Sequence, residues 1–254
     1  MTHWTIYYAG FIAIIFLALA GWVLSLARDN VNHSEGLWSL SIGMAAYCYA
    51  LFFYDLHART WLILLLITLW AVRLAAYLGW RDWLKAENFR YAALRKKNPT
   101  FFWLTSLLTV FGAQGCMAWL VSMPLFAAIE SNAPLNFFDL LGALLVIFGV
   151  MFATIADAQL AKFSQHTQHQ VLMTGLWHYC RHPNYLGECC VWWGFFCIAL
   201  AVNAWWSVIS PLLVMLILWR NGITKIEKNM LTHRPQYPRY MQTTPQLFPK
   251  FTKK

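Results

Sequence analysis

Residues 7–26 read YYAGFIAIIFLALAGWVLSL, a predominantly apolar run of 20 residues without a charged side chain. An α-helix of about 20 apolar residues is long enough to cross the hydrocarbon core of a bilayer. The run lacks the basic segment that precedes the apolar core of a secretory signal peptide. We therefore expect it to be retained as the first of several membrane-spanning helices.

The composition of the whole chain is typical of an integral membrane protein. Hydrophobic residues make up 60% of the 254 residues and charged residues only 11%, whereas soluble domains carry about 25% charged residues. The 15 tryptophans fit a protein whose amphipathic rings lie at the membrane–water interface. The formal net charge of +9 does not predict nucleic-acid binding, because the basic residues fall between apolar runs, where anionic lipid is the expected partner.

The pattern of apolar runs and loop charges predicts the topology. We expect an all-α protein with seven transmembrane helices at about 5–27, 37–54, 61–80, 101–128, 137–160, 185–201 and 204–220. The connections after the odd-numbered helices hold 17 of the 19 basic residues. This asymmetry predicts an N-terminus outside and a C-terminus in the cytoplasm, in a single transmembrane domain over residues 1–254 of a bacterial inner membrane.

Two polar segments belong to the cytoplasmic side of this predicted topology. Residues 81–99 have the pattern of an interfacial amphipathic helix, which either anchors the chain to lipid headgroups or gates a substrate. Residues 221–254 are polar and interrupted by prolines, so we expect a cytoplasmic C-terminal cap rather than a separate domain.

The densest polar cluster of the chain is at residues 175–188, which read GLWHYCRHPNYLGE. A buried polar group costs free energy unless it is paired, so seven polar side chains beside an apolar run indicate a polar ligand. The seven are His178, Tyr179, Arg181, His182, Asn184, Tyr185 and Glu188.

The spacing inside this motif predicts the start of a helix. Pro183 suits the first helical position, and Asn184 and Glu188 then lie one turn apart on the same face. Arg181 and His182 bring positive charge to that helix N-terminus, which favours a phosphate site. Helix capping alone also explains the position of Glu188.

Polar residues at membrane depth are further candidates. Arg73 interrupts the third run and has Tyr77 one turn further on; it either snorkels to the interface or faces a ligand phosphate. Asp157, near the cytoplasmic end of the fifth run, is followed by Gln159 and Lys162. Asp157 either lies at a hydrated helix end or accepts hydrogen bonds from a ligand or an arginine.

Other polar residues complete the candidates, and several familiar sites are not indicated. Glu35 precedes the second run, while Glu227 and Tyr237 lie in the cap, where they are placed to close over a ligand. His166 and His169 are three residues apart, but no further ligands accompany them, so no metal site is expected. The chain has no CxxC pair and no glycine-rich phosphate loop.

The motif at 175–188 resembles the signature of a family of membrane proteins of unknown function (DUF1295) grouped with the steroid 5-alpha-reductase C-terminal domain. The similarity covers about residues 60–250. It includes the segments 157–159 (DAQ), 226–231 (IEKNML), 234–237 (RPQY) and 248–249 (FP).

This resemblance implies a seven-helix fold, NADPH bound in the cytoplasmic half and a substrate cavity open to lipid. Asn184 and Glu188 match family residues that contact the nicotinamide end of the cofactor, Asp157 matches an acid that contacts the cofactor, and Arg73 matches an arginine of helix three. The predicted cofactor-binding residues are Arg73, Asp157, Gln159, Lys162, Tyr179, Arg181, His182, Asn184, Tyr185, Glu188, Glu227 and Tyr237.

The implied reaction is reduction of a carbon–carbon double bond conjugated to a carbonyl in a lipophilic substrate. An enolate develops on the carbonyl oxygen, so a hydrogen-bond donor is required there. The steroid reductases have a tyrosine where this chain has Trp70, and their catalytic glutamate is one residue out of register with Glu35. We expect Glu35, in its protonated form, and Tyr77 to be the catalytic residues, with Tyr47 as an alternative donor.

Two other functions remain open. Isoprenylcysteine and phospholipid methyltransferases, which use S-adenosylmethionine, share a related Arg-His-Pro-x-Tyr element, present here at residues 181–185. The second of these is a non-catalytic lipid-binding or scaffold protein, although a scaffold does not require buried polar residues such as Asn184, Glu188 and Arg181. The expected partners are a lipophilic small molecule and membrane lipids, with no nucleic acid and no metal.

Overall fold

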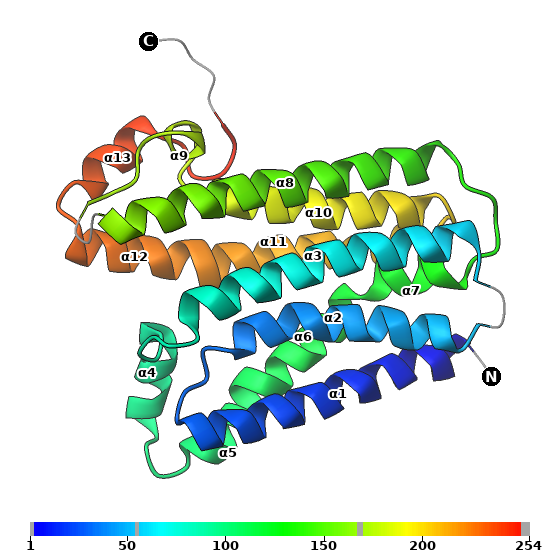
Figure 1. The fold of residues 1–254 in the computed structure, drawn as a ribbon, viewed down its shortest axis with the longest axis horizontal. Helices are drawn as coiled ribbons and strands as arrows, with labels where there is room; N and C mark the ends of the chain where they lie inside the picture. The colour runs from blue at the N-terminus through cyan, green and yellow to red at the C-terminus, as the bar shows by residue number, and fades with distance from the viewer. Residues whose placement is uncertain (1–2, 54–55, 167–169, 250–254) are drawn as a thin grey trace. The chain divides into compact units, whose positions relative to one another are not determined.

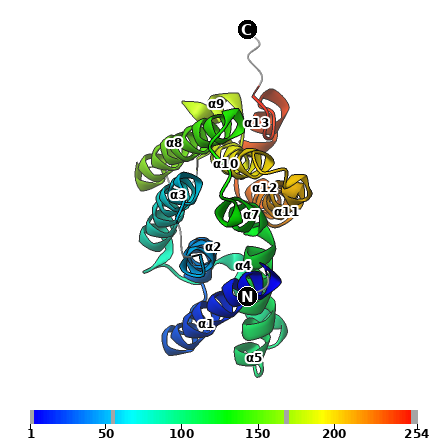
Figure 2. The same cartoon turned by 90° about the vertical axis from the view of Figure 1, so that its right-hand side faces the viewer.

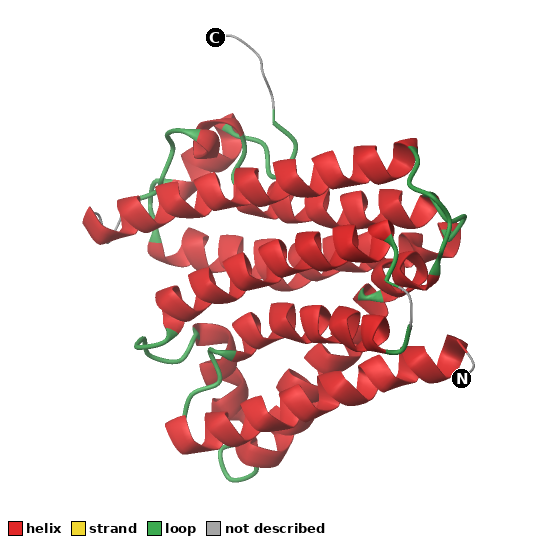
Figure 3. Cartoon of the chain, turned by 45° about the vertical axis from the view of Figure 1, so that its right-hand side comes forward, coloured by secondary structure: helices red, strands yellow, loops and turns green. Residues whose placement is uncertain are grey.

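The computed structural model describes residues 3–53, 56–166 and 170–249, and within these ranges it contains helices and loops but no strand (Figure 1, Figure 3). The all-α prediction is therefore confirmed. In order, the elements are α1 (His3–Arg28), α2 (Ser34–Leu51), α3 (Ala58–Asp82), α4 (Phe89–Lys97), α5 (Phe102–Ser106), η1 (Leu107–Gly112), α6 (Ala113–Val121), α7 (Met123–Glu130), α8 (Phe137–His166), α9 (Leu176–Tyr179), α10 (Pro183–Leu200), η2 (Trp205–Val208), α11 (Ile209–Ile217), η3 (Leu218–Ile223), α12 (Thr224–His233) and α13 (Tyr237–Thr243).

Five helical stretches among the described residues are long and apolar enough to cross a membrane. They coincide with the first, third, fourth, fifth and seventh predicted spans, which supports an integral membrane protein. The second and sixth predicted spans correspond to α2 and α10, 18-residue helices that are less apolar. The five stretches are His3–Arg28, Ala58–Asp82, Phe102–Val121, Phe137–Gln165 and Trp205–His233.

Two predicted helices are shorter than expected. The fourth predicted span, 101–128, is interrupted at Ser122, because Pro124, in the first turn of the next helix, lacks the N–H that would continue the preceding one. In the amphipathic segment 81–99, α3 ends at Asp82, and the rest is helical only over α4, whose N-terminus is capped by Asn88: the side-chain oxygen accepts from the N–H of Arg90 at 3.2 Å.

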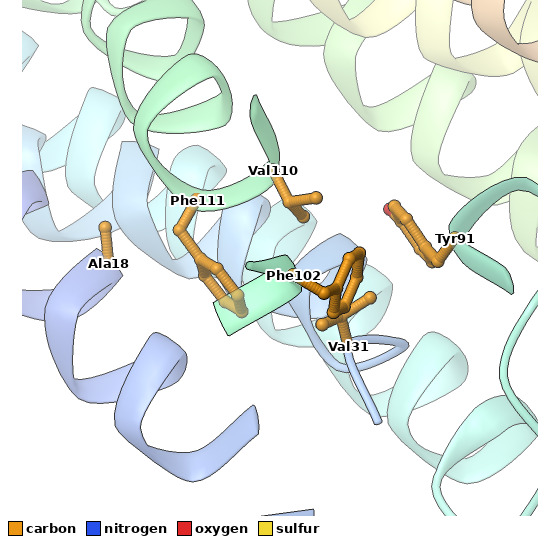
Figure 4. Close-up of a cluster of buried hydrophobic side chains, with 6 residues drawn as sticks. All are labelled: Ala18, Val31, Tyr91, Phe102, Val110 and Phe111. Atoms are coloured by element: carbon orange, nitrogen blue, oxygen red, sulfur yellow. The ribbon is translucent and has the colours of Figure 1, made fainter. Parts of the chain in front are cut away.

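Packing divides the chain into two compact units, each described here by itself: Met1–Asp139 with Ala199–Ser207 (unit 1), and Leu140–Ile198 with Val208–Lys254 (unit 2). In unit 1, α2 packs against both α1 and α3. A cluster of buried apolar side chains from α1, the loop after it, α4, α5 and η1 is drawn in Figure 4; its members are Ala18, Val31, Tyr91, Phe102, Val110 and Phe111.

Unit 1 also contains a buried ion pair at the start of α3. Arg59 is fully buried and donates from Nε and Nη2 to the two carboxylate oxygens of Asp139, at 2.7 Å each. Its Nη1 and Nη2 also donate to the carbonyls of Ala133 and Pro134. These contacts keep the charge of Arg59 paired inside the protein.

Unit 2 is built on the close packing of α8 and α10, which lie side by side in two views (Figure 1, Figure 2). Glycines allow this approach: a Cβ added to Gly142 would lie 2.5 Å from the carbonyl oxygen of Gly194, and one on Gly149 would lie 2.5 Å from that of Gly187. Backbones at this distance fix the register of the two helices. That register determines which polar residues meet at their ends.

Candidate functional site

One contact in unit 2 joins two of the predicted cofactor-binding residues. Asn184, in the first turn of α10, donates from Nδ2 to Oδ1 of the buried Asp157 on α8, at 3.1 Å. The amide oxygen of Asn184, Oδ1, is buried and has no hydrogen-bond partner among the described residues. Buried acceptors are almost always satisfied in folded proteins, so this oxygen indicates a ligand that donates a hydrogen bond.

The predicted helix start places a second carboxylate beside this pair. The helix α10 begins at Pro183, as expected for a proline at the first helical position. Asn184 and Glu188 are therefore one turn apart on the same side of the helix. Glu188 is buried as well, so this end of α10 presents an amide and a carboxylate away from bulk water.

A tight turn holds the first part of the motif against α8. Gly175 has φ +62°, and a Cβ there would lie 2.5 Å from Oε1 of Gln159. The same Oε1 accepts a hydrogen bond from the N–H of Leu176 at 2.9 Å, and the indole of Trp177 donates to the carbonyl of Ala156 at 3.0 Å. Glycine is required here by both the positive φ and the lack of space.

This turn borders an open recess of about 410 Å³. Gln159, Tyr179 and the exposed His178 supply polar groups to it, and Gln159 is two residues after Asp157 on α8. The recess can take the polar part of an extended ligand. Its lining residues are Gln159, Met173, Thr174, Gly175, Leu176, His178 and Tyr179.

The next part of the motif is bonded to the C-terminal cap. Oε1 of the buried Glu227 on α12 accepts from Nε of Arg181 at 2.8 Å and lies 3.0 Å from Nε2 of His182. Oε2 of Glu227 accepts from Nε2 of Gln246 at 3.2 Å. Arg181 also donates from Nη1 to the carbonyl of Thr244 at 2.6 Å.

These contacts give Arg181, His182 and Glu227 a structural role that the sequence did not indicate. Arg181 and His182 were expected at a ligand phosphate, but both contact Glu227, and Arg181 also bonds the residues after α13. Gln246 was missed altogether, because nothing in its local sequence distinguishes it. Gln246 belongs to this network only because the fold brings it to Glu227, which in turn contacts Arg181, a residue distant in the sequence.

Aromatic side chains complete the packing of the cap. The Tyr185 ring stacks on the His182 ring, with centroids 5.5 Å apart and an angle of 14° between planes. The Tyr240 hydroxyl, on α13, donates to the carbonyl of Trp177. Tyr237 is buried, and burial raises the pKa of its phenol. Tyr237 is thus a packed residue of the cap, while Lys162 is exposed on α8.

The two predicted catalytic residues belong to unit 1. Glu35 accepts hydrogen bonds from Nη2 of Arg81, at 3.3 Å, and from Nη2 of Arg90. Both carboxylate oxygens of Glu35 therefore face guanidinium donors. The hydroxyl of Tyr91 lies 3.4 Å from Oε1 of Glu35. Burial, and to a smaller extent the charge of Glu35, raise the pKa of Tyr91 to about 12.

Tyr77 lies between two arginines of α3. The guanidinium carbon of Arg73 is 5.9 Å from the Tyr77 ring centroid, as the one-turn spacing predicts, and that of Arg81 is 5.7 Å away. Trp70 is fully buried and packs edge-on against Trp38. Tyr47, the alternative donor, hydrogen-bonds to Thr68 at 2.7 Å.

In the part of the chain that the structure describes, no three His, Cys, Asp or Glu residues lie close enough together to hold a metal ion. His169 lies outside the described residues, and the side chain of His166 is not described.

Comparison with known proteins places the chain in a family without a described activity. No curated protein and no solved structure matches it significantly. A family model described as a protein of unknown function, DUF1295, matches residues 21–244. Because this match extends over nearly the whole chain, and includes both the Asp157–Asn184 pair and the Arg181–Glu227 network, the protein belongs to the DUF1295 family.

Proposed function

We propose that this membrane protein is an NADPH-dependent reductase of a carbon–carbon double bond conjugated to a carbonyl in a lipophilic substrate. The observation that supports it best is the Asp157–Asn184 pair, with the buried Oδ1 of Asn184 lacking a partner among the described residues. Glu188, on the same face of α10, adds a buried carboxylate.

These acceptor groups fit the nicotinamide end of the cofactor. A carboxamide NH₂ requires hydrogen-bond acceptors, and Asn184 and Glu188 both offer oxygens. Because Nδ2 of Asn184 is held by Asp157, its Oδ1 has a defined direction. The recess beside Gln159 and Tyr179 would accommodate a polar part of the dinucleotide, and the exposed Lys162 is the candidate for its phosphates, since Arg181 is bonded within the cap.

When bound, NADPH supplies the hydride, and the protein supplies binding, orientation and protection from water. Asp157 orients Asn184, and the Arg181–Glu227 pair keeps the cap closed over the motif. We propose Tyr77 rather than Glu35 as the proton donor at the enolate oxygen, because both carboxylate oxygens of Glu35 accept hydrogen bonds from arginines. Glu35 then acts as a positioning residue that holds Arg81.

The proposal includes a seven-span topology in which α2 and α10 also cross the membrane. The distribution of basic residues supports an N-terminus outside, a C-terminus in the cytoplasm and a cytoplasmic cofactor site, in a bacterial inner membrane. A reporter enzyme that is active only in the cytoplasm, fused after Lys254, is expected to be active; an inactive fusion would reverse the orientation.

A methyltransferase that uses S-adenosylmethionine is the alternative, supported by the Arg-His-Pro-x-Tyr element at 181–185. Thermal unfolding of the detergent-solubilised protein with NADPH, NADH, S-adenosylmethionine or S-adenosylhomocysteine separates the two. A ligand at 100 times its Kd stabilises the protein by about 2.7 kcal/mol. We expect a higher Tm with NADPH. Stabilisation by the two adenosyl compounds alone would establish the alternative, and no shift with any of the four would exclude both.

A further inference from the structure

A second cavity in unit 2 lies on another side of α10 from the polar pair. It has a volume of about 140 Å³ and walls from α10, α11, η3 and the residues after α13. Tyr185 and Cys189 line it. Tyr185 directly follows Asn184, and Cys189 directly follows Glu188, and one residue is a rotation of about 100° around a helix. The cavity therefore lies on a different face of α10 from Asn184 and Glu188, and Tyr185, one of the predicted cofactor-binding residues, belongs to its wall. Its lining residues are Tyr185, Cys189, Met215, Leu218, Trp219, Ile223, Gln246 and Leu247.

The walls of this cavity are almost entirely apolar. Met215 is held in place by the indole of Trp193, whose Nε1 lies 3.3 Å from the sulfur. The amide of Gln246 is directed to Glu227, at 3.2 Å. Well-packed protein interiors contain few voids larger than a water molecule, and an apolar cavity of roughly 150 Å³ stays dry and accepts apolar molecules. Because the lining is apolar, the cavity favours a hydrocarbon as its ligand.

A change of helix type accompanies the cavity. The element η3 is a six-residue π-helix, a form that is rare and frequently found at functional sites. Within it, Gly222 packs against the Tyr185 ring so closely that a Cβ would lie 2.6 Å from a ring carbon. The wider turn and the glycine thus set the distance between η3 and α10, which is where the cavity lies.

The cavity borders the outer apolar surface of the same helix. Trp219 lines it and is nevertheless 58% exposed. Leu212 and Leu216, on the preceding turns of α11, are also exposed. All three belong to the candidate span Trp205–His233, whose exposed apolar side chains face lipid in a membrane protein. A hydrocarbon chain can therefore reach the cavity from the bilayer.

We propose that the cavity bounded by Cys189, Met215, Trp219 and Ile223 binds the end of a hydrocarbon chain that enters from the membrane beside Trp219. The chain comes either from a membrane lipid or from the apolar tail of the enzyme's substrate. The inference depends on the cavity and on the exposed apolar surface beside Trp219, and only the second source of the chain rests on the proposed function.

Photo-crosslinking of the full-length wild-type protein tests it without any substitution. The probe is a long-chain fatty acid with a diazirine at its terminal carbon, added to the detergent-solubilised protein and mapped by peptide mass spectrometry. We expect labels concentrated on the lining residues. Labels spread over other exposed apolar helices, such as α1, with no enrichment at the cavity would overturn the proposal.

A filling variant gives a second, independent readout. Cys189→Phe places a ring in the cavity, and it is expected to reduce labelling of the lining residues about tenfold, equivalent to a tenfold weaker Kd. Cys197→Phe, on the same helix but outside the lining, is the matched control and should label like the wild type. Equal labelling in a folded Cys189→Phe protein would contradict the proposal.

Competition then distinguishes the two sources of the chain. Phospholipid vesicles are expected to displace the probe if the occupant is a membrane acyl chain. A long-chain α,β-unsaturated ketone that displaces the probe when phospholipid does not would identify the substrate tail. Either result supports the hydrocarbon site, whereas displacement by neither, even at saturation, contradicts it.

Discussion

Arg181 and Glu227, 46 residues apart in the sequence, form a buried ion pair in which Nε donates to Oε1 over 2.8 Å. The pair bonds the central motif to α12, and His182 and Gln246 contact the same carboxylate. The motif and the cap are therefore one structural unit, and the stability of each depends on the other.

The first prediction concerns this pair. Glu227→Ala leaves the guanidinium of Arg181 buried without its counter-charge, which costs about 3–5 kcal/mol. We expect a large decrease of Tm in detergent. Asp29→Ala is the control, because Asp29 pairs with Arg95 at 2.6 Å but is 86% exposed, and exposed pairs contribute about 0–1 kcal/mol. Similar losses for the two variants would show that Arg181 is not buried as described.

The second prediction concerns Asn184. Asn184→Leu removes the buried acceptor that we assign to the nicotinamide carboxamide, and an unmade hydrogen bond of this kind costs about 1–3 kcal/mol of binding free energy. The Kd for NADPH, measured by calorimetry, is expected to increase accordingly. Asn229→Leu, on α12, should bind like the wild type. An unchanged Kd in the Asn184 variant would remove Asn184 from the site.

The third prediction concerns the contact of α8 with α10. Gly149→Ala places a Cβ 2.5 Å from the carbonyl oxygen of Gly187, with backbone rather than a flexible side chain in the way. Overpacking of this kind costs about 1–3 kcal/mol, so Tm should decrease. Gly79→Ala is the control: no atom lies within 4 Å of its Cβ, and alanine favours a helix by about 1 kcal/mol. A stable Gly149→Ala protein would show that the helices are further apart.

The fourth prediction concerns pH. Burial raises the pKa of the Cys180 thiol from 9.0 to about 11. Between these values the folded protein keeps a proton that the unfolded chain has lost, so Cys180 contributes stability that is fully present below pH 9 and is lost as pH rises to about 11. In chemical denaturation, the difference in unfolding free energy between wild type and Cys180→Ala should be constant below pH 9 and should decrease above it.

A Cys180→Ala profile parallel to the wild type up to pH 11 would show that the thiol is in contact with solvent.

Local features of the fold were predictable because they depend on neighbours in the chain. The run at 7–26 lies within α1, Pro183 begins α10, and the one-turn spacing of Arg73 and Tyr77 brings them together on α3. Helical periodicity and helix-start preferences act over a few residues, so the sequence contains this information directly.

The partners of the polar residues were not predictable in the same way. Glu35 was predicted as a catalytic residue, and the sequence did not show that Arg81 and Arg90, 46 and 55 residues away, donate hydrogen bonds to it. Arg181 and His182 were assigned to a phosphate, yet both contact Glu227. A charged side chain shows in the sequence that it requires a partner, but the choice of partner depends on which segments pack together.

The sequence by itself determined an all-helical membrane protein with a polar motif at the start of α10, because hydropathy and helical periodicity are local properties. Only the tertiary structure decided that Asn184 meets Asp157, leaving one buried amide oxygen without a partner among the described residues. The physical reason is the register of α8 against α10, which is set by contact between glycine backbones at Gly149 and Gly187 rather than by any property of the polar residues.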